Sequence, residues 1–226
     1  MNPGVTPQSL ERLAGGDLRF SSPLEIALLL SAMALLPAAI AAVTPFLRIS
    51  LVLHFLRQAL GTQTAPSNQV LLGLSLFLTL IVMRPTMREL QTAAVEPYQK
   101  KQITLAEAVE RGRGPLKKFL LRFAREKDIG LFLEMTKTPA PARAAEVDLD
   151  ILLAAYVLSE LKAGFQIGAV LFLPFLVIDL VAASVTLTIG MVQLPPVMIS
   201  APFKILLFTL VDGWNLVIGS LVKSFG

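Results

Sequence analysis

Five charged residues stand in or beside a strongly apolar part of the sequence, where a charge needs a chemical reason: Glu160, Lys162, Asp179, Lys204 and Asp212. A charge at the centre of a bilayer costs about 2.5–3.5 kcal/mol on insertion scales, so it usually faces protein or water and has a partner. Glu160 and Lys204 flank the apolar stretch Ala163–Phe203 at its two ends. We therefore predict that they pair, within a subunit or between neighbours. The alternative is that both side chains reach the membrane interface.

The residues that follow Glu160 form one face of a predicted helix. Gly164 and Gly168 stand four and eight positions after it, and the face continues through Phe172, Phe175 and Asp179. A Gly-x-x-x-Gly pattern lets two helix backbones approach closely. We expect this face to contact another helix or subunit rather than lipid. Pro174 should kink the helix, because it removes a backbone donor.

The segment Gly190-Met191-Val192-Gln193-Leu194-Pro195-Pro196 cannot continue a regular helix, because its two prolines lack the N–H group. Irregular backbone at membrane depth is tolerated only inside protein or along an aqueous cavity. The hypothesis is a loop that lines or seals a pore. The alternative is an ordinary turn between two spans.

Little else in the chain could perform chemistry. There is no cysteine and only one histidine, His54, so a paired-histidine zinc motif and a thiol nucleophile are both impossible. No glycine-rich phosphate loop is present. We expect His54 to be packed or interfacial, and we expect no enzymatic activity, no metal and no cofactor.

The composition is typical of a membrane protein. The chain is 54% hydrophobic and 16% charged, against about 45–50% and about 25% in an average soluble chain. Ile26–Leu47 is a 22-residue uncharged run that can cross a bilayer, with Pro37 as a tolerated kink. Val70–Met83 has 14 residues, which is short for a span and favours a buried or re-entrant helix. The 41 residues of Ala163–Phe203 suffice for two spans joined by a turn.

The segment 84–150 differs from its surroundings. It holds 13 of the 20 basic and 10 of the 16 acidic residues, which predicts a water-exposed helical insert. Aromatic residues do not interleave with its basic ones, which argues against nucleic-acid binding. We therefore divide the chain into an N-terminal tail (1–23), apolar helices (24–83), the insert (84–150) and a helical hairpin (151–226).

Within the insert, local signals predict three helices. Thr104 and Glu107 have capping-box spacing, Gly112 and Gly114-Pro115 should end the first helix, and Asp128 should cap the third. The apolar face of the second helix consists of Leu116, Phe119, Leu120 and Phe123, and Pro139-Ala140-Pro141 is a predicted linker.

Two further expectations concern topology. Arg48 and Arg57 favour a cytoplasmic link between the first two apolar segments, which would place the insert outside. Residues 1–23 carry no net charge, and no cleavable secretory signal is evident there.

Many short motifs in one order resemble the FliP family of the bacterial flagellar type III export gate, over roughly residues 35–224. They are Leu60-Gly61-Thr62, Pro66-Ser67-Asn68-Gln69-Val70-Leu71, Arg125-Glu126-Lys127-Asp128-Ile129-Gly130-Leu131-Phe132, Ser159-Glu160-Leu161-Lys162, Phe165-Gln166-Ile167-Gly168, Pro174-Phe175-Leu176-Val177-Ile178-Asp179, Pro202-Phe203-Lys204 and Val211-Asp212-Gly213-Trp214.

The resemblance implies an all-α membrane protein of kinked helical hairpins, with about four apolar segments and a charged extracytoplasmic insert. It implies a pentamer that assembles with FliQ, FliR and other export-apparatus membrane proteins in the flagellar basal body. Unfolded flagellar proteins would cross the bacterial inner membrane through the resulting channel. No chemistry is expected of the subunit itself, because the energy comes from the proton gradient and an associated ATPase.

The resemblance also implies roles for particular residues. Glu160 and Lys204 match an inter-subunit charge pair, and Met191 matches the first position of a methionine-rich loop that acts as a pore gasket. Here Val192 and Gln193 replace further methionines, so neighbouring subunits could close through hydrogen bonds instead.

Two alternatives stay open. An injectisome export-gate subunit would share the fold, although the motifs at Arg125–Phe132 and Asn68-Gln69-Val70 look more flagellar. A small proton-coupled secondary transporter would use Glu160 and Asp179 as proton carriers, and it would work without FliQ and FliR.

Overall fold

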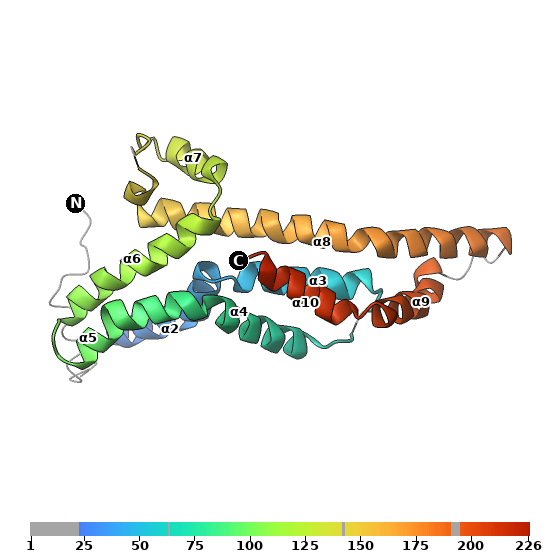
Figure 1. Cartoon of the computed structure of the whole chain (residues 1–226), viewed down its shortest axis with the longest axis horizontal. Coiled ribbons are helices and arrows are strands. Elements are labelled where there is room, and N and C mark those ends of the chain that lie inside the picture. The colour runs from blue at the N-terminus through green and yellow to red at the C-terminus, as the bar shows by residue number, and fades with distance from the viewer. Residues whose placement is uncertain (1–22, 63, 142, 191–194) are drawn as a thin grey trace. The chain divides into compact units, whose positions relative to one another are not determined.

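The structure is a computed structural model of the 226-residue chain, and it describes residues 23–62, 64–141, 143–190 and 195–226. Over this part of the chain every regular element is a helix, and none is a strand, which confirms the predicted all-α class (Figure 1). The helices are α2 (Pro23–Val43), α3 (Phe46–Ala59), α4 (Asn68–Leu90), the π-helix η1 (Gln91–Val95), α5 (Glu96–Gln99), α6 (Leu105–Phe123), α7 (Glu126–Met135), the 3-10 helix η2 (Ala144–Glu146), α8 (Leu149–Thr188), α9 (Pro196–Leu210) and α10 (Gly213–Lys223).

Several of these helices are long and apolar enough to cross a membrane. Two stretches, Asn68–Gln99 and Leu149–Thr188, meet this test by themselves. Two bent pairs of helices meet it when each pair is taken as one span. One is Leu29–Val43 with Phe46–Ala59. The other is Pro196–Leu210 with Gly213–Lys223, whose two helices are bent by 68° relative to each other. By length and composition, the described residues thus contain two to four segments that could cross a membrane, in agreement with the predicted four apolar segments.

The boundaries of the first helices differ from the prediction. The run Ile26–Leu47 is not one helix, because α2 ends at Val43 and α3 begins at Phe46. The break falls at Thr44-Pro45, where proline supplies no N–H and disfavours helical backbone in the preceding residue. The prediction of a short helix over Val70–Met83 was also wrong. That helix accommodates Pro85 and continues as α4, η1 and α5 to Gln99.

Helix α6 begins as predicted but ends later. The capping box is confirmed: the Glu107 N–H donates to the Thr104 hydroxyl at 3.3 Å, and the Thr104 N–H donates to Glu107 Oε2 at 2.9 Å. The predicted stop at Gly112 and Gly114-Pro115 was wrong, because the helix runs through them to Phe123. A Cβ atom at Gly112 would lie 3.6 Å from a methyl group of Leu90, which is an ordinary contact, so packing does not require a glycine at this position.

Helix α7 is not capped by Asp128. It begins at Glu126, which places Asp128 inside its first turn, and the Asp128 side chain is buried. The hydroxyl of Ser159 on α8 donates to Asp128 Oδ2 at 2.6 Å and accepts from the Arg125 N–H at 2.9 Å. A serine 31 positions away in the sequence therefore ties down the start of α7.

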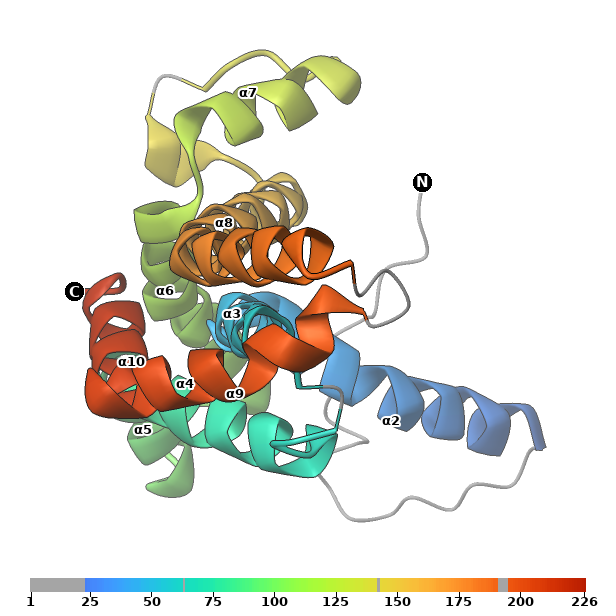
Figure 2. The same cartoon turned by 90° about the vertical axis from the view of Figure 1, so that its right-hand side faces the viewer.

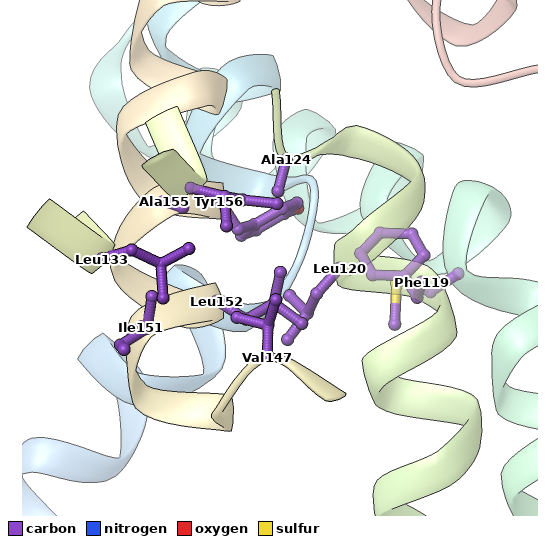
Figure 3. Close-up of a cluster of buried hydrophobic side chains, with 11 residues drawn as sticks. Phe119, Leu120, Ala124, Leu133, Val147, Ile151, Leu152, Ala155 and Tyr156 are labelled. Carbon is purple, nitrogen blue, oxygen red and sulfur yellow. The ribbon is translucent and has the colours of Figure 1, made fainter. Parts of the chain in front are cut away.

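By contact, the chain forms two compact units, and each is described by itself. The described residues of the first lie within 23–43 and 83–159. Its core is an apolar cluster between α6, α7 and the beginning of α8 (Figure 3). Phe119 and Leu120 are buried there, with Leu116 and Phe123 packed beside them, which confirms the predicted apolar face. The other buried members are Met83, Ala124, Ile129, Leu133, Val147, Ile151, Leu152, Ala155 and Tyr156.

The described residues of the second unit lie within 44–82 and 160–226. It contains α3, the larger part of α8, α9 and α10, and Figure 2 shows α3 lying alongside α8. Its buried apolar cluster is formed by Leu56, Ala59, Leu60, Phe175, Phe208 and Val217. Helix α8, drawn as one continuous helix in Figure 1, contributes residues to both units, and Pro174 lies inside it. The four predicted segments were drawn by charge and hydropathy, whereas these units are defined by contact.

Candidate functional site

The glycine-bearing face of α8 packs against α3 in the second unit. A Cβ atom at Gly164 would lie 2.8 Å from Leu51 Cδ2, and one at Gly168 would lie 2.3 Å from Phe55 Cδ2. A side chain at Gly168 would meet the Phe55 ring, and one at Gly164 would displace the flexible end of Leu51, so α3 approaches this face of α8 closely. The Phe55 ring is also in edge contact with Phe165, at a centroid distance of 5.3 Å, and with Phe172 at 6.1 Å.

At one end of this face, Glu160 is paired with Arg48 of α3. The Arg48 Nε donates to Glu160 Oε2 at 3.0 Å, and Nη2 donates to Oε1. Only 7% of the Arg48 side chain and none of the Glu160 side chain is exposed. Two parallel hydrogen bonds of this kind are the geometry in which arginine binds a carboxylate most strongly. The pair fixes the register of α3 on α8, one helical turn before Gly164.

The remaining donors of Arg48 face the segment that follows α10. Its Nη1 donates to the carbonyl oxygen of Ser224 at 3.3 Å and to the Ser224 hydroxyl at 3.2 Å. The guanidinium carbon lies 4.1 Å from the centre of the Phe225 ring. Arg48 thereby connects α3, α8 and the residues after α10.

A second ion pair lies further along α8. Lys204 Nζ on α9 donates to Asp179 Oδ2 at 2.6 Å, and the Ser200 hydroxyl lies 2.5 Å from Asp179 Oδ1. Only 3% of the Lys204 side chain is exposed, against 29% of Asp179. Both carboxylates of the α8 face are thus neutralised by a cation of the same chain, as apolar surroundings require.

The predicted charge pair of Glu160 and Lys204 is not formed within one subunit. Glu160 and Lys204 do not pair with each other there, because Arg48 holds the first and Asp179 holds the second. A pair between neighbouring subunits stays a prediction, since the structure is of a single chain. Sequence reasoning used Arg48 only to assign topology. The signal that could have found it is its spacing: Arg48, Leu51 and Phe55 stand at i, i+3 and i+7, on one helix face.

The predicted gasket residues Met191, Val192 and Gln193 lie outside the described residues. The residues on both sides of them are described. Gly190 has a left-handed φ of +76° just after α8, and Pro195 immediately precedes α9. A left-handed glycine after a helix and a proline at the first helical position are common stop and start signals.

Neither His54 nor the acidic side chains of the described residues indicate a catalytic or metal-binding site. The His54 Nδ1 atom lies 2.7 Å from the Ser50 carbonyl oxygen of its own helix, and the residue is half-buried, as predicted for a packed position. In the part of the chain that the structure describes, no three acidic or histidine side chains are grouped as metal ligands would be.

Long apolar helices, in which Glu160 is paired with Arg48 and Asp179 with Lys204, are typical of the class of multi-span helical membrane proteins. Comparison with known proteins narrows this class. The model of the FliP family matches residues 29–221. Similar curated proteins include the flagellar biosynthetic protein FliP of Pectobacterium carotovorum, 47% identical over 99% of this chain and 85% of its own length. The FliP protein of Bacillus subtilis is 46% identical over 91% of this chain and 93% of its own length. That of Caulobacter vibrioides is 48% identical over 87% of this chain and 74% of its own length.

The chain therefore belongs to the FliP family. Family membership makes it a flagellar export component, and its apolar helices fit a protein embedded in a membrane.

Proposed function

We propose that the chain is a core, non-enzymatic subunit of the flagellar type III export gate. Together with FliQ and FliR it would form the channel through which unfolded flagellar proteins cross the inner membrane. The observation that carries this proposal is the extent of the family match, which runs from residue 29 to residue 221 and includes parts of both compact units. The flagellar names of the three relatives favour a flagellar gate over an injectisome gate.

The ion pairs favour a gate over a proton-coupled transporter. A proton-carrying carboxylate must gain and lose its proton during each cycle. Here Glu160 is bound by Arg48, and Asp179 is bound by Lys204 and the Ser200 hydroxyl. Both carboxylates are thus part of the packing between helices of the second unit, which suits a structural subunit.

Contact between copies is expected at Glu160 and Lys204. A carboxylate has about four acceptor positions, so one that already binds an arginine can accept a further donor. We propose that Lys204 of a neighbouring subunit approaches Glu160 when several copies assemble, in addition to the pair with Arg48 or in its place. The pentameric number of copies follows from the family resemblance.

We further propose that the segment around Met191, Val192 and Gln193 faces the pore. The stop signal at Gly190 and the start signal at Pro195-Pro196 support a tight connection between α8 and α9. A loop held between two helices in this way can project as one short tip, and several copies would form a ring. We also propose that the charged insert 84–150 lies on the extracytoplasmic side, as the family resemblance and the positions of Arg48 and Arg57 favour.

Copurification tests the proposed function. The chain, tagged and expressed together with FliQ and FliR, should be extracted from membranes as a complex of several copies with these two small hydrophobic partners. Loss of the gene should abolish export of flagellar proteins. A protein that transports a solute in liposomes as a monomer, and that extracts without partners, would contradict the proposal.

A charge exchange tests the inter-subunit pair separately. Glu160→Lys should disrupt assembly, and adding Lys204→Glu should partly restore it. The two internal pairs cannot account for such rescue, since the double variant places a lysine beside Arg48 and a glutamate beside Asp179. If the double variant assembles no better than the single one, the inter-subunit pair is wrong.

A further inference from the structure

Arg48 is held by two groups of partners, and the Glu160 carboxylate is only one of them. A guanidinium has five N–H donors in a planar fork. Its Nε and Nη2 atoms bind Glu160, whereas Nη1 binds the carbonyl oxygen and the hydroxyl of Ser224. Phe225 presents its ring 4.1 Å from the guanidinium carbon.

Three independent attractions act on the Ser224 side. The Ser224 carbonyl belongs to the C-terminal end of α10, where the helix dipole favours a cation. The Ser224 hydroxyl donates to the Leu221 carbonyl at 2.6 Å, which orients its lone pairs toward the N–H of Arg48. The face of the Phe225 ring adds a cation–π contact, which is strongest where water is excluded. Phe225 is itself buried, with 6% of its surface exposed.

We propose that Ser224 and Phe225 form a latch that holds Arg48 on Glu160 and keeps Glu160 inaccessible. Without these residues Arg48 would lose two hydrogen bonds and a ring contact, in a place where the loss of a buried hydrogen bond is costly. Arg48 would then be better solvated in a rotamer that reaches water. Glu160, which is fully buried beside it, would become accessible as Arg48 moves. Ser224 and Phe225 are positioning residues, because they act on Glu160 through Arg48.

The latch gives the subunit a way to control when Glu160 can change partner. With the latch closed, both carboxylate oxygens of Glu160 are bound by Arg48. With the latch open, Arg48 loses its contacts with Ser224 and Phe225, and Glu160 becomes available to a cation of another subunit. This consequence rests on the proposed function, whereas the latch itself acts within one chain and can be tested there.

Carboxylate labelling of the full chain in detergent tests the latch. A water-soluble carbodiimide with an amine nucleophile modifies accessible carboxylates, and mass spectrometry reports the rate at each residue. Phe225→Leu keeps an apolar side chain but removes the ring face, so we expect the labelling rate of Glu160 to rise by about 2-fold to 30-fold. Phe225→Trp restores a ring and should return the rate close to that of the unaltered chain.

Two matched controls separate a local opening from general loosening. Asp128 is an equally buried carboxylate of the other unit, with 1% of its surface exposed, and its rate should not change. Phe208→Leu removes a buried ring of the same unit that contacts Phe175 and Trp214. This variant should leave the Glu160 rate unaltered.

The labelling rates can overturn the proposal in two ways. If Glu160 is labelled at the same rate in the unaltered chain and in Phe225→Leu, the segment does not hold Arg48. If the rates of Glu160 and Asp128 rise in parallel, the segment supports the whole fold and is not a latch. Neither result bears on copurification, so failure of the latch and failure of the proposed export gate are distinguishable.

Discussion

Gly168→Ala is the perturbation whose effect follows most directly from the structure. The added Cβ atom would lie 2.3, 2.7 and 3.0 Å from three carbons of the Phe55 ring. An ordinary contact begins near 3.4 Å, so the ring must withdraw by about 1 Å, the difference between 3.4 and 2.3 Å. Phe165 and Phe172 are in contact with the same ring, which limits that movement. Overpacking of this kind costs about 1–3 kcal/mol.

A control is needed because alanine favours a helix over glycine by about 0.5–1 kcal/mol. Gly73 lies within α4 of the same unit, and a Cβ atom there would meet nothing within 4 Å. Gly73→Ala therefore has the helix gain without the overpacking. The difference in unfolding free energy between the two variants should equal the overpacking cost, about 1–3 kcal/mol. Gly164→Ala should lie between them, because the nearest atom is the flexible end of Leu51.

Equilibrium unfolding in detergent, followed by circular dichroism, measures these differences. The expected order of stability is Gly73→Ala, then Gly164→Ala, then Gly168→Ala. If Gly168→Ala is as stable as Gly73→Ala, α8 and α3 do not pack as closely as described, and the account of the glycine face is refuted.

Three further predictions concern the ion pairs and one helix cap. Arg48→Met leaves Glu160 buried without its cation and should destabilise the subunit by about 3–5 kcal/mol. Changing both Arg48 and Glu160 to methionine should recover most of that loss. Equal unfolding midpoints for the single and double variants would count against this. Asp179→Asn should be more harmful than Lys204→Met, because it leaves the buried Lys204 cation without a counter-charge, whereas Lys204→Met leaves a carboxylate whose side chain is 29% exposed. Protease resistance in detergent should be lower for Asp179→Asn. Thr104→Ala removes one half of the capping box and should cost about 0.5–2 kcal/mol, visible as faster amide hydrogen exchange confined to the first turn of α6.

Local signals in the sequence predicted local structure well. Thr104 and Glu107 form the expected capping box, and Phe119 and Leu120 face a core as their spacing requires. Local stop signals failed, because a single glycine or proline weakens a helix without always ending it. Pro85 is inside α4 rather than after it, and α6 continues through Gly112 and Gly114-Pro115.

The candidate site was predictable only in part. The spacing of Gly164 and Gly168 indicated a close-packing face, and α3 occupies it. The ionic partners were missed, because Arg48 and Glu160 are 112 positions apart and meet only through the packing of α3 on α8. Asp179 was considered as a proton carrier rather than as the partner of Lys204, since nothing in the spacing joins residues of α8 and α9 across the loop between them.

Crosslinking in intact membranes tests most directly the central claim, that copies of this chain meet around a pore. The chain contains no cysteine, so Met191→Cys and Gln193→Cys introduce unique thiols. Mild oxidation should give crosslinked species of more than one chain from both variants, and a bifunctional thiol reagent of matching length should do the same. A chain that remains entirely monomeric in both variants, while export continues, would contradict the account.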